Sequence, residues 1–367
     1  MKNPSKIIFA NQLRGVAALL VVLSHLCSVF WGARDTVALY TGALPIEGAQ
    51  PGFGFYLTNQ HWNTGALGVA IFFAISGFVI PMSLGSAGRL RFLVARAFRI
   101  YPTYIAALSL ALFAVWLSCH YWGHPFMWKL TVILRNMMLV HNLTGAPTVD
   151  LVNWTLAVEL KFYLVAALIA PLIVAGRVWP LIGIALLVYG VNRFSHTALG
   201  TEMYFVTFMF MGVLFNYQFR GLIGLPKFLA SLAVIFGLFV AGWDASPWPD
   251  ALLITGVNYL YGLLIFGAAY LARHHFRNLR PLDFLADISY PLYILHSLIG
   301  YSVMRVLFDR GLDPWWVAAV TALVILLAAT LIHVLVERPT IALGKALRRP
   351  PATSGSPSGA VDVRAAS

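Results

Sequence analysis

Two ionisable side chains lie inside segments that are apolar enough to cross a membrane. His25 follows the apolar residues 15–23, and Glu159 lies in the stretch that begins with Asn153 and Trp154. Ionisable groups are costly to place in hydrocarbon, so they usually mark a reaction site or a substrate path. An imidazole and a carboxylate can share general acid–base work, which makes His25 and Glu159 the candidates for catalysis.

The two side chains are expected at similar depths in the membrane. If Trp31 marks the outer end of the first span, His25 lies about 9 Å below the outer surface. The span that contains Glu159 runs the other way, and the same rise places the carboxylate about 10 Å deep. We therefore expect Glu159 to orient His25 as a catalytic partner. The alternative is a polar pair that only holds two helices together.

A basic run, expected to be a loop, follows the second apolar segment and contains Arg89, Arg91, Arg96 and Arg99. If the next helix begins here, the spacing of Arg96 and Arg99 places both guanidinium groups on one helical face. Two planar donors on one face suit a phosphate-bearing ligand. The alternative is that these arginines set topology or contact anionic lipid headgroups.

The composition restricts the class of protein. The chain has 367 residues, of which 60% are hydrophobic and 10% are charged, whereas charged residues make up about 25% of soluble domains. The net charge of +12 comes from cations that flank apolar segments, which argues against a nucleic-acid-binding surface. The sequence therefore predicts an all-α polytopic membrane protein.

Hydropathy predicts about ten transmembrane helices. The expected spans are 12–31, 65–84, 99–120, 152–174, 178–195, 201–217, 224–242, 251–272, 288–308 and 315–336. Residues 130–140 are apolar but too short to span, and should lie in the interface or re-enter the membrane. Residues 1–340 are expected to form one membrane domain, and residues 341–367 a cytoplasmic, largely disordered tail.

The distribution of lysine and arginine predicts the orientation. With the N-terminus inside, 18 of these residues fall in cytoplasmic segments and 6 in outer segments. Cytoplasmic loops are enriched in positive charge, so both termini are expected in the cytoplasm.

Other polar groups in the predicted spans are less specific. Ser76 precedes Gly77, and small residues of this kind often serve helix packing. His296 either lines a substrate path or satisfies a neighbour. Cys27 and Cys119 have no metal-site spacing, and whether they form a disulfide is open. No metal site is predicted.

Five motifs in this order resemble the membrane-bound acyltransferase family 3, in its stand-alone form. They are residues 13–18 leading to His25, residues 72–78, residues 96–102, residues 154–163 and residues 289–296. The resemblance extends to about Pro339. Lys161 departs from the pattern, because an aromatic residue is commoner at this place in the family.

The resemblance implies an O-acyltransferase of the bacterial cytoplasmic (inner) membrane. Its donor would be acyl-CoA, most often acetyl-CoA, and its acceptor a carbohydrate or glycolipid, with membrane lipids around the bundle. His25 would be catalytic with Glu159 as its partner, and the histidine would act either as a general base or as an acyl carrier. The residues expected to bind the donor are Arg96, Arg99, Tyr101 and Arg14, and those expected to line a pocket are Ser76, Asn153, Trp154 and His296.

A secondary transporter or flippase for a lipid-linked saccharide is the alternative function. Such proteins often carry broken helices in matching halves of the chain. Pro81, Pro102 and Pro171 lie at the ends of predicted spans and form no symmetric pair. The sequence therefore favours the acyltransferase, while the acceptor, the acyl group and the choice between monomer and homodimer stay open.

Overall fold

The apolar stretches of the chain form helices throughout the part that the structure describes. This computed structural model describes residues 7–48, 50–59, 61–85, 88–195, 197–244 and 256–348. Within these ranges the extended backbone pairing is limited to one isolated bridge between Thr58 and Asn63. The predicted all-α class is confirmed for the described residues.

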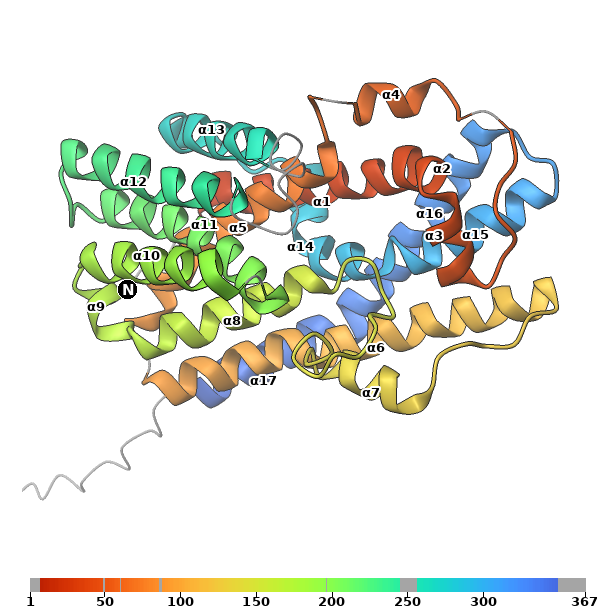
Figure 1. Ribbon diagram of the computed structural model, residues 1–367, viewed down its shortest axis with the longest axis horizontal. Coiled ribbons are helices and arrows are strands. Elements are labelled where there is room, and N and C mark those ends of the chain that lie inside the picture. The colour runs from red at the N-terminus through yellow and green to blue at the C-terminus, as the bar shows by residue number, and fades with distance from the viewer. Residues whose placement is uncertain are drawn as a thin grey trace, which may run out of the picture.

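The helices lie roughly along the long axis of the molecule (Figure 1). Their bounds are α1 Ile8–Ser24, η1 His25–Val29, α2 Phe30–Gly32, α3 Arg34–Thr41, α4 Phe53–Leu57, α5 Thr64–Leu84, α6 Arg89–Trp122, α7 Leu130–Met137, α8 Trp154–Leu168, α9 Ala170–Val174, α10 Trp179–Ser195, α11 Ala198–Phe219, α12 Leu225–Asp244, α13 Val257–Leu271, η3 Arg273–His275, α14 Arg280–Leu295, α15 Leu298–Asp309, α16 Pro314–Ile332, η4 His333–Glu337 and α17 Arg338–Arg348. Every predicted span overlaps at least one of these helices.

Fewer helices than predicted are long and apolar enough to cross a membrane. Among the described residues six qualify, or seven if the bent pair α14–α15 is one span. Val257–Leu271 is a shorter apolar helix, and residues 251–255 of the predicted span 251–272 lie outside the described residues. The fold is thus that of a polytopic helical membrane protein.

Helix α6 begins well before the predicted span at 99–120. It starts at Arg89 and continues for 34 residues to Trp122, with Pro102 inside it. At 1.5 Å per residue this helix is about 50 Å long, which exceeds the hydrocarbon thickness of about 30 Å. The basic run is therefore helical, and its expected assignment to a loop was wrong. Pro81 lies in the last turn of α5, close to the end of the helix as expected.

The ninth predicted span, 288–308, is not a straight helix. It is divided into α14 and α15, which meet at an angle of 71° with His296 and Ser297 at the break. Pro291 lies inside α14, five residues before His296.

Helix α5 crosses α11 at very close range. A Cβ atom on Gly77 would lie 1.9 Å from the carbonyl oxygen of Met209, and one on Gly212 would lie 2.3 Å from that of Ala74. Only two glycines allow the backbones to approach this far. The interpretation of Gly77 as a packing residue is therefore confirmed by its contacts.

The beginning of α1 and the end of α17 lie toward the same end of the molecule, at the left in Figure 1. Helix α17 packs on the first half of α6, where a Cβ on Gly344 would lie 2.9 Å from that of Phe98. Residues 341–348 therefore belong to the packed bundle, and the predicted tail boundary at 340 was too early. The rest of that tail, residues 349–367, lies outside the described residues.

Candidate active site

His25 stands where α1 changes its hydrogen-bonding pattern. Residues His25–Val29 form one turn of π-helix, in which the Phe30 amide donates to the carbonyl oxygen of His25. Such π segments are rare and occur often at functional sites. The wider turn places the His25 side chain at the edge of a cavity of about 260 Å³.

This His25 cavity is lined mainly by aromatic and small residues. The lining includes Ser24, Asn63, Val69, Leu151, Trp154, Phe205, Tyr259 and Tyr293. Trp154 was predicted to line a pocket and does so. A concave site with aromatic walls and a few polar groups is typical of a site for an organic substrate.

Two neighbours hold the His25 ring. Its Nδ1 atom lies 2.6 Å from the phenol oxygen of Tyr301. The ring of His296 meets it edge to face, with 4.6 Å between the ring centroids. His296 was predicted to line a pocket. It is instead fully buried and contacts the His25 ring.

The tautomer of His296 follows from its own hydrogen bond. Its Nδ1 atom lies 2.7 Å from the carbonyl oxygen of Tyr293, and a carbonyl only accepts, so Nδ1 carries the proton. The Nε2 atom is buried without a hydrogen-bond partner. A buried imidazole without a counter-ion is stable in its neutral form, so His25 faces a neutral ring.

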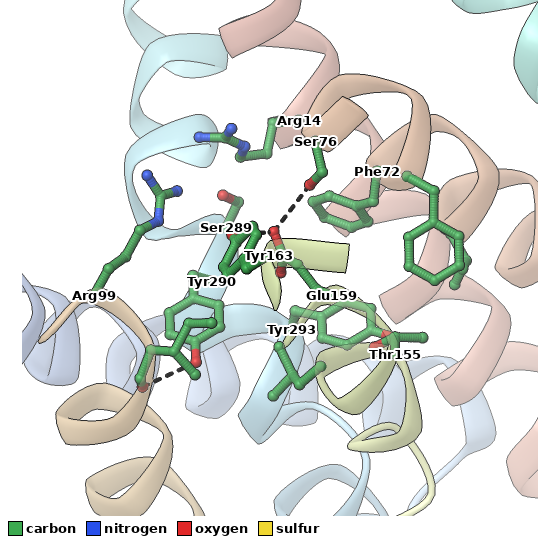
Figure 2. A pocket seen from close by; sticks show the side chains of 14 residues that line it. Arg14, Phe72, Ser76, Arg99, Thr155, Glu159, Tyr163, Ser289, Tyr290 and Tyr293 are labelled. Carbon is green, nitrogen blue, oxygen red and sulfur yellow. Dashed lines mark hydrogen bonds between the residues drawn. The ribbon is translucent and has the colours of Figure 1, made fainter. Parts of the chain in front are cut away.

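Glu159 has other partners than the predicted one. Its Oε1 atom accepts hydrogen bonds from Ser76 Oγ at 3.0 Å and from Tyr163 Oη at 2.5 Å. Figure 2 shows this carboxylate in a second pocket, which Ser76 lines as predicted. The expected contact between Glu159 and His25 is not made.

Glu159 does not reach His25 because α8 starts inside the protein, beside the cavity of His25. Leu151 and Val152, just before this helix, and Trp154, its first residue, already line the cavity of His25. Glu159 is five residues further along α8, so it lies about 7 Å beyond that level. The two side chains would lie at equal depth only if α8 began at the outer surface, as predicted.

Arg14 and Arg99 enter the Glu159 pocket from α1 and α6. Figure 2 shows their guanidinium groups on the same side of the pocket, near Ser289. Arg14 interacts electrostatically with both Arg99 and Glu159. Arg96 also interacts electrostatically with Arg14, and the buried carboxylate of Glu337 interacts with Arg14 and Arg99. Three arginines against two carboxylates leave an excess of positive charge, which suits an anionic ligand group. We call the pocket that Arg14, Arg99 and Glu159 line the arginine pocket.

Arg96 and Tyr101 do not line this pocket. Arg96 donates to Ser83 Oγ at 2.7 Å and lies over the rings of Phe92 and Tyr163, 5.4 Å from each centroid. Tyr101 donates to the carbonyl oxygen of Met138 at 3.3 Å. The structure therefore brings Arg14 and Arg99 together, whereas Arg96 packs beside the pocket and Tyr101 points to the segment after α7.

Asn153, also predicted to line a pocket, is buried in the chain's own packing. Its Nδ2 atom donates to Asn136 Oδ1 at 2.9 Å, and its Oδ1 atom accepts from Thr148 Oγ1 at 2.9 Å. These bonds tie the start of α8 to α7 and to the connection between them. Asn153 thus positions Trp154 and does not face a ligand.

Lys161, where the chain departs from the resemblance, turns away from both cavities. Its Nζ atom lies 2.7 Å from Glu202 Oε2 on α11. Cys27 and Cys119 are both free thiols. Among the described residues, no cluster of three potential metal-binding side chains occurs.

The His25 cavity and the arginine pocket share two wall residues, Val69 and Tyr293. The phenol of Tyr293 forms a hydrogen bond of 2.9 Å with Thr155 Oγ1. A ligand long enough to reach past this wall would extend from Arg14 to His25. The two residues are eleven positions apart on the helix, or about 16 Å.

Sequence reasoning missed the tyrosines of this site. Tyr163, Tyr293 and Tyr301 supply the hydroxyl partners of Glu159, Thr155 and His25. Tyr293 lies in one of the recognised motifs and Tyr163 ends another, so their positions were visible. Nothing in the order of residues signalled Tyr301, because it reaches His25 only through the break between α14 and α15.

Comparisons with known proteins agree with this architecture. A family model described as an acyltransferase domain matches residues 7–334. The chain is 25% identical over 323 residues to the exopolysaccharide production protein ExoZ of Rhizobium meliloti (strain 1021), covering 79% of this chain and 94% of that protein. It is 33% identical over 124 residues to protein 2 in the picA locus of Rhizobium radiobacter, covering 32% of this chain and 49% of that protein.

No solved structure matches the chain significantly. The family model spans α1 to η4, the helices that carry His25, Ser76, Arg99, Glu159 and Tyr293. The chain belongs to the acyltransferase 3 family.

Proposed function

We propose that this protein transfers an acyl group, most simply acetyl, from acyl-CoA to a hydroxyl group of a carbohydrate acceptor. The observation that carries the proposal is the pair of adjoining cavities, one with two arginines and one with His25. The family supports acyl transfer in general. The printed name of the relative ExoZ concerns exopolysaccharide production, which supports a carbohydrate acceptor.

Acyl-CoA fits the arginine pocket by charge and shape. The guanidinium groups of Arg14 and Arg99 would bind donor phosphates, because planar forks pair well with phosphate oxygens. The thin pantetheine arm would then extend past Tyr293 to bring the thioester to His25. The excess of cytoplasmic lysine and arginine supports a donor that enters from the cytoplasm.

The acceptor would bind in the cavity that contains His25. Trp154, Phe205 and Tyr259 give this cavity aromatic walls, which suit the apolar faces of sugar rings. An exported or lipid-linked glycan could enter from the outer side, opposite to the donor. We place the protein in a bacterial inner membrane on this basis.

The chemistry follows from the imidazole. In the direct route, Nε2 of His25 takes the proton of the acceptor hydroxyl while its oxygen attacks the thioester carbon. The carbon–sulfur bond breaks, and the CoA thiolate leaves with the proton that His25 held. In the covalent route, Nε2 attacks the thioester carbon, the carbon–sulfur bond breaks, and the CoA thiolate leaves with the proton of the acylated imidazole. The acceptor hydroxyl then attacks the acyl-imidazole, its oxygen takes the acyl group, and its proton returns to the imidazole. Both routes use the lone pair of Nε2.

One observation bears on transport as the alternative. The bent pair α14–α15 is a broken helix, as occurs in many transporters. Within the described residues it is a single pair without a matching break in the other half. The acyltransferase is therefore the better-supported function.

Mass spectrometry of surface polysaccharide and glycolipids tests the proposal. The comparison uses the host strain, a strain that lacks this gene, and that strain complemented with wild type, His25→Ala or His120→Ala. His120 is an exposed histidine stacked on Trp116, so its variant is the matched control. We expect an acyl mass increment that wild type and His120→Ala restore and His25→Ala does not.

Two outcomes would contradict the proposal. Full restoration by His25→Ala would remove the catalytic assignment. An unchanged ester pattern in the deletion strain, with unmodified precursor accumulating inside the cell, would favour transport.

A further inference from the structure

The hydrogen bond between His25 and Tyr301 joins an imidazole to a group that can both donate and accept. The distance from Nδ1 to Oη is 2.6 Å. A neutral imidazole has one protonated and one free nitrogen, and the partner of one nitrogen selects which is which. The direction of this hydrogen bond therefore determines whether Nε2 carries a hydrogen or a free lone pair.

The proposed reaction requires that His25 be the donor of this hydrogen bond. The lone pair must be on Nε2, so Nδ1 must carry the proton and donate it to the phenol oxygen of Tyr301. The opposite direction would leave a hydrogen on Nε2 and block both routes of acyl transfer. His296 Nε2 also has a lone pair, but it forms no hydrogen bond with the His25 ring, whereas the phenol oxygen of Tyr301 lies within hydrogen-bond distance of His25 Nδ1.

Tyr301 is held rigidly at the start of α15. Its side chain is fully buried, and its ring lies 6.0 Å from that of Phe30 by centroids. Its backbone amide donates to the carbonyl oxygen of Ser297 at 2.8 Å. Ser297 Oγ in turn donates to Asp150 Oδ1 at 2.7 Å. The break between α14 and α15 is thus tied to the connection before α8.

Asp150 lies near enough to Tyr301 to influence the charge state of the phenol. The carboxylate interacts electrostatically with Tyr301, and its Oδ2 atom is buried without a hydrogen-bond partner. Burial raises the pKa of Asp150 to about 6, against an opposing hydrogen bond from Ser297, so the group is mostly ionised at pH 7. A negative charge near the phenol disfavours the phenolate form, so Tyr301 stays a neutral hydroxyl whose oxygen has lone pairs for His25 Nδ1–H.

We infer that Tyr301 is a positioning residue that holds His25 in the tautomer with a free Nε2, with Ser297 and Asp150 as its anchor. The inference rests on the proposed function and extends it by naming the group that orients His25. Tyr301 thus takes the orienting role that the sequence assigned to Glu159, which lines the arginine pocket instead.

Removing only the hydroxyl group of Tyr301 tests the inference. Tyr301→Phe keeps the buried ring, and the matched control is Tyr217→Phe. Tyr217 is equally buried, and its hydroxyl donates to the carbonyl oxygen of Arg177. In purified full-length protein we expect Tyr301→Phe to lower kcat about 10- to 100-fold, since an oriented base contributes about 10²- to 10⁴-fold. KM for acetyl-CoA should stay within about twofold, because Tyr301 does not line the arginine pocket.

A second measurement does not depend on turnover. Diethylpyrocarbonate modifies imidazole nitrogens that have a free lone pair, and peptide mass spectrometry gives the rate at His25 alone. We expect slower modification of His25 in Tyr301→Phe and an unchanged rate in Tyr217→Phe. Ser297→Ala removes the hydrogen bond between Ser297 and Asp150, so it should also slow the modification of His25. This variant tests the inference if Tyr301→Phe does not fold.

Unchanged kcat and unchanged modification of His25 in Tyr301→Phe would overturn the inference. Failure of the proposed function would look different. Wild type would then transfer no acyl group, while the difference in modification rates between wild type and Tyr301→Phe would still be seen.

Discussion

Tyr293 and Thr155 are joined by a hydrogen bond of 2.9 Å in the wall between the two cavities. Tyr293 comes from α14 and Thr155 from the first turn of α8. The pair therefore lies where an acyl group would pass on its way from the arginine pocket to His25.

The size of the Tyr293 side chain is expected to limit the acyl group. Tyr293→Ala should widen the passage, so the ratio of kcat/KM for butyryl-CoA to that for acetyl-CoA should rise about tenfold. A hydrophobic site discriminates one or two methylene groups by about 1–3 kcal/mol. Tyr293→Phe keeps the ring and should leave the ratio unchanged. Equal ratios in all three proteins would show that Tyr293 does not restrict the passage.

Arg14 and Arg99 should differ from Arg96 in their effect on the donor. Arg14→Ala or Arg99→Ala is expected to raise KM for acyl-CoA about tenfold or more, because a charge-assisted bond to phosphate is lost. Arg96→Ala should change KM less and lower the melting temperature more, since Arg96 bonds Ser83 and lies over Phe92 and Tyr163. Arg99→Lys should restore the donor affinity only in part.

Steady-state kinetics and a thermal melt of the same preparations check this prediction. The control is Arg193→Ala, an exposed position near the end of α10. A KM that rises for Arg96→Ala and stays at the wild-type value for Arg14→Ala and Arg99→Ala would contradict the assignment of the pocket.

Asp150 is expected to make the stability of the protein depend on pH. Burial raises the pKa of this carboxyl to about 6, whereas an unfolded chain gives about 3.9. Between these values the folded state binds more protons than the unfolded state, so the contribution to stability falls as pH rises from about 4 to about 6. Asp150→Asn removes this contribution and keeps an oxygen for the hydroxyl of Ser297.

As pH rises from about 4 to about 6, the melting temperature of wild type should therefore fall by about 2–5 °C relative to that of Asp150→Asn. Thermal melts in detergent at several pH values measure the difference. Parallel curves for the two proteins would mean that Asp150 titrates alike in the folded and unfolded states.

Gly77 should tolerate no side chain. Gly77→Ala would place a methyl group 1.9 Å from the carbonyl oxygen of Met209, so α5 and α11 would have to separate. We expect a loss of about 2–4 kcal/mol of folding free energy, as in other overpacked or strained sites. Gly237→Ala, in α12 with open space around it, should be neutral or stabilising by about 0.5–1 kcal/mol.

Retained folded fraction and melting temperature after gel filtration measure both variants. Equal behaviour of Gly77→Ala and Gly237→Ala would show that the α5–α11 contact is looser than the structure has it.

The sequence by itself determined the helical membrane class, the family and the residues with chemical potential. Apolar length and charge bias depend only on local composition, because the bilayer selects long apolar segments whatever their partners. His25, Arg14, Arg99, Ser76 and Trp154 could be identified because polar groups inside apolar segments stand out in the sequence.

Only the tertiary structure decided which of these residues meet. The sequence predicted that His25 and Glu159 meet, but α8 begins beside the His25 cavity, so Glu159 lies further along the helix, in the pocket with Arg14. The break between α14 and α15 brings Tyr301 to His25 instead. Such contacts depend on where helices begin, bend and cross, and these features arise from packing between distant segments that no local pattern encodes.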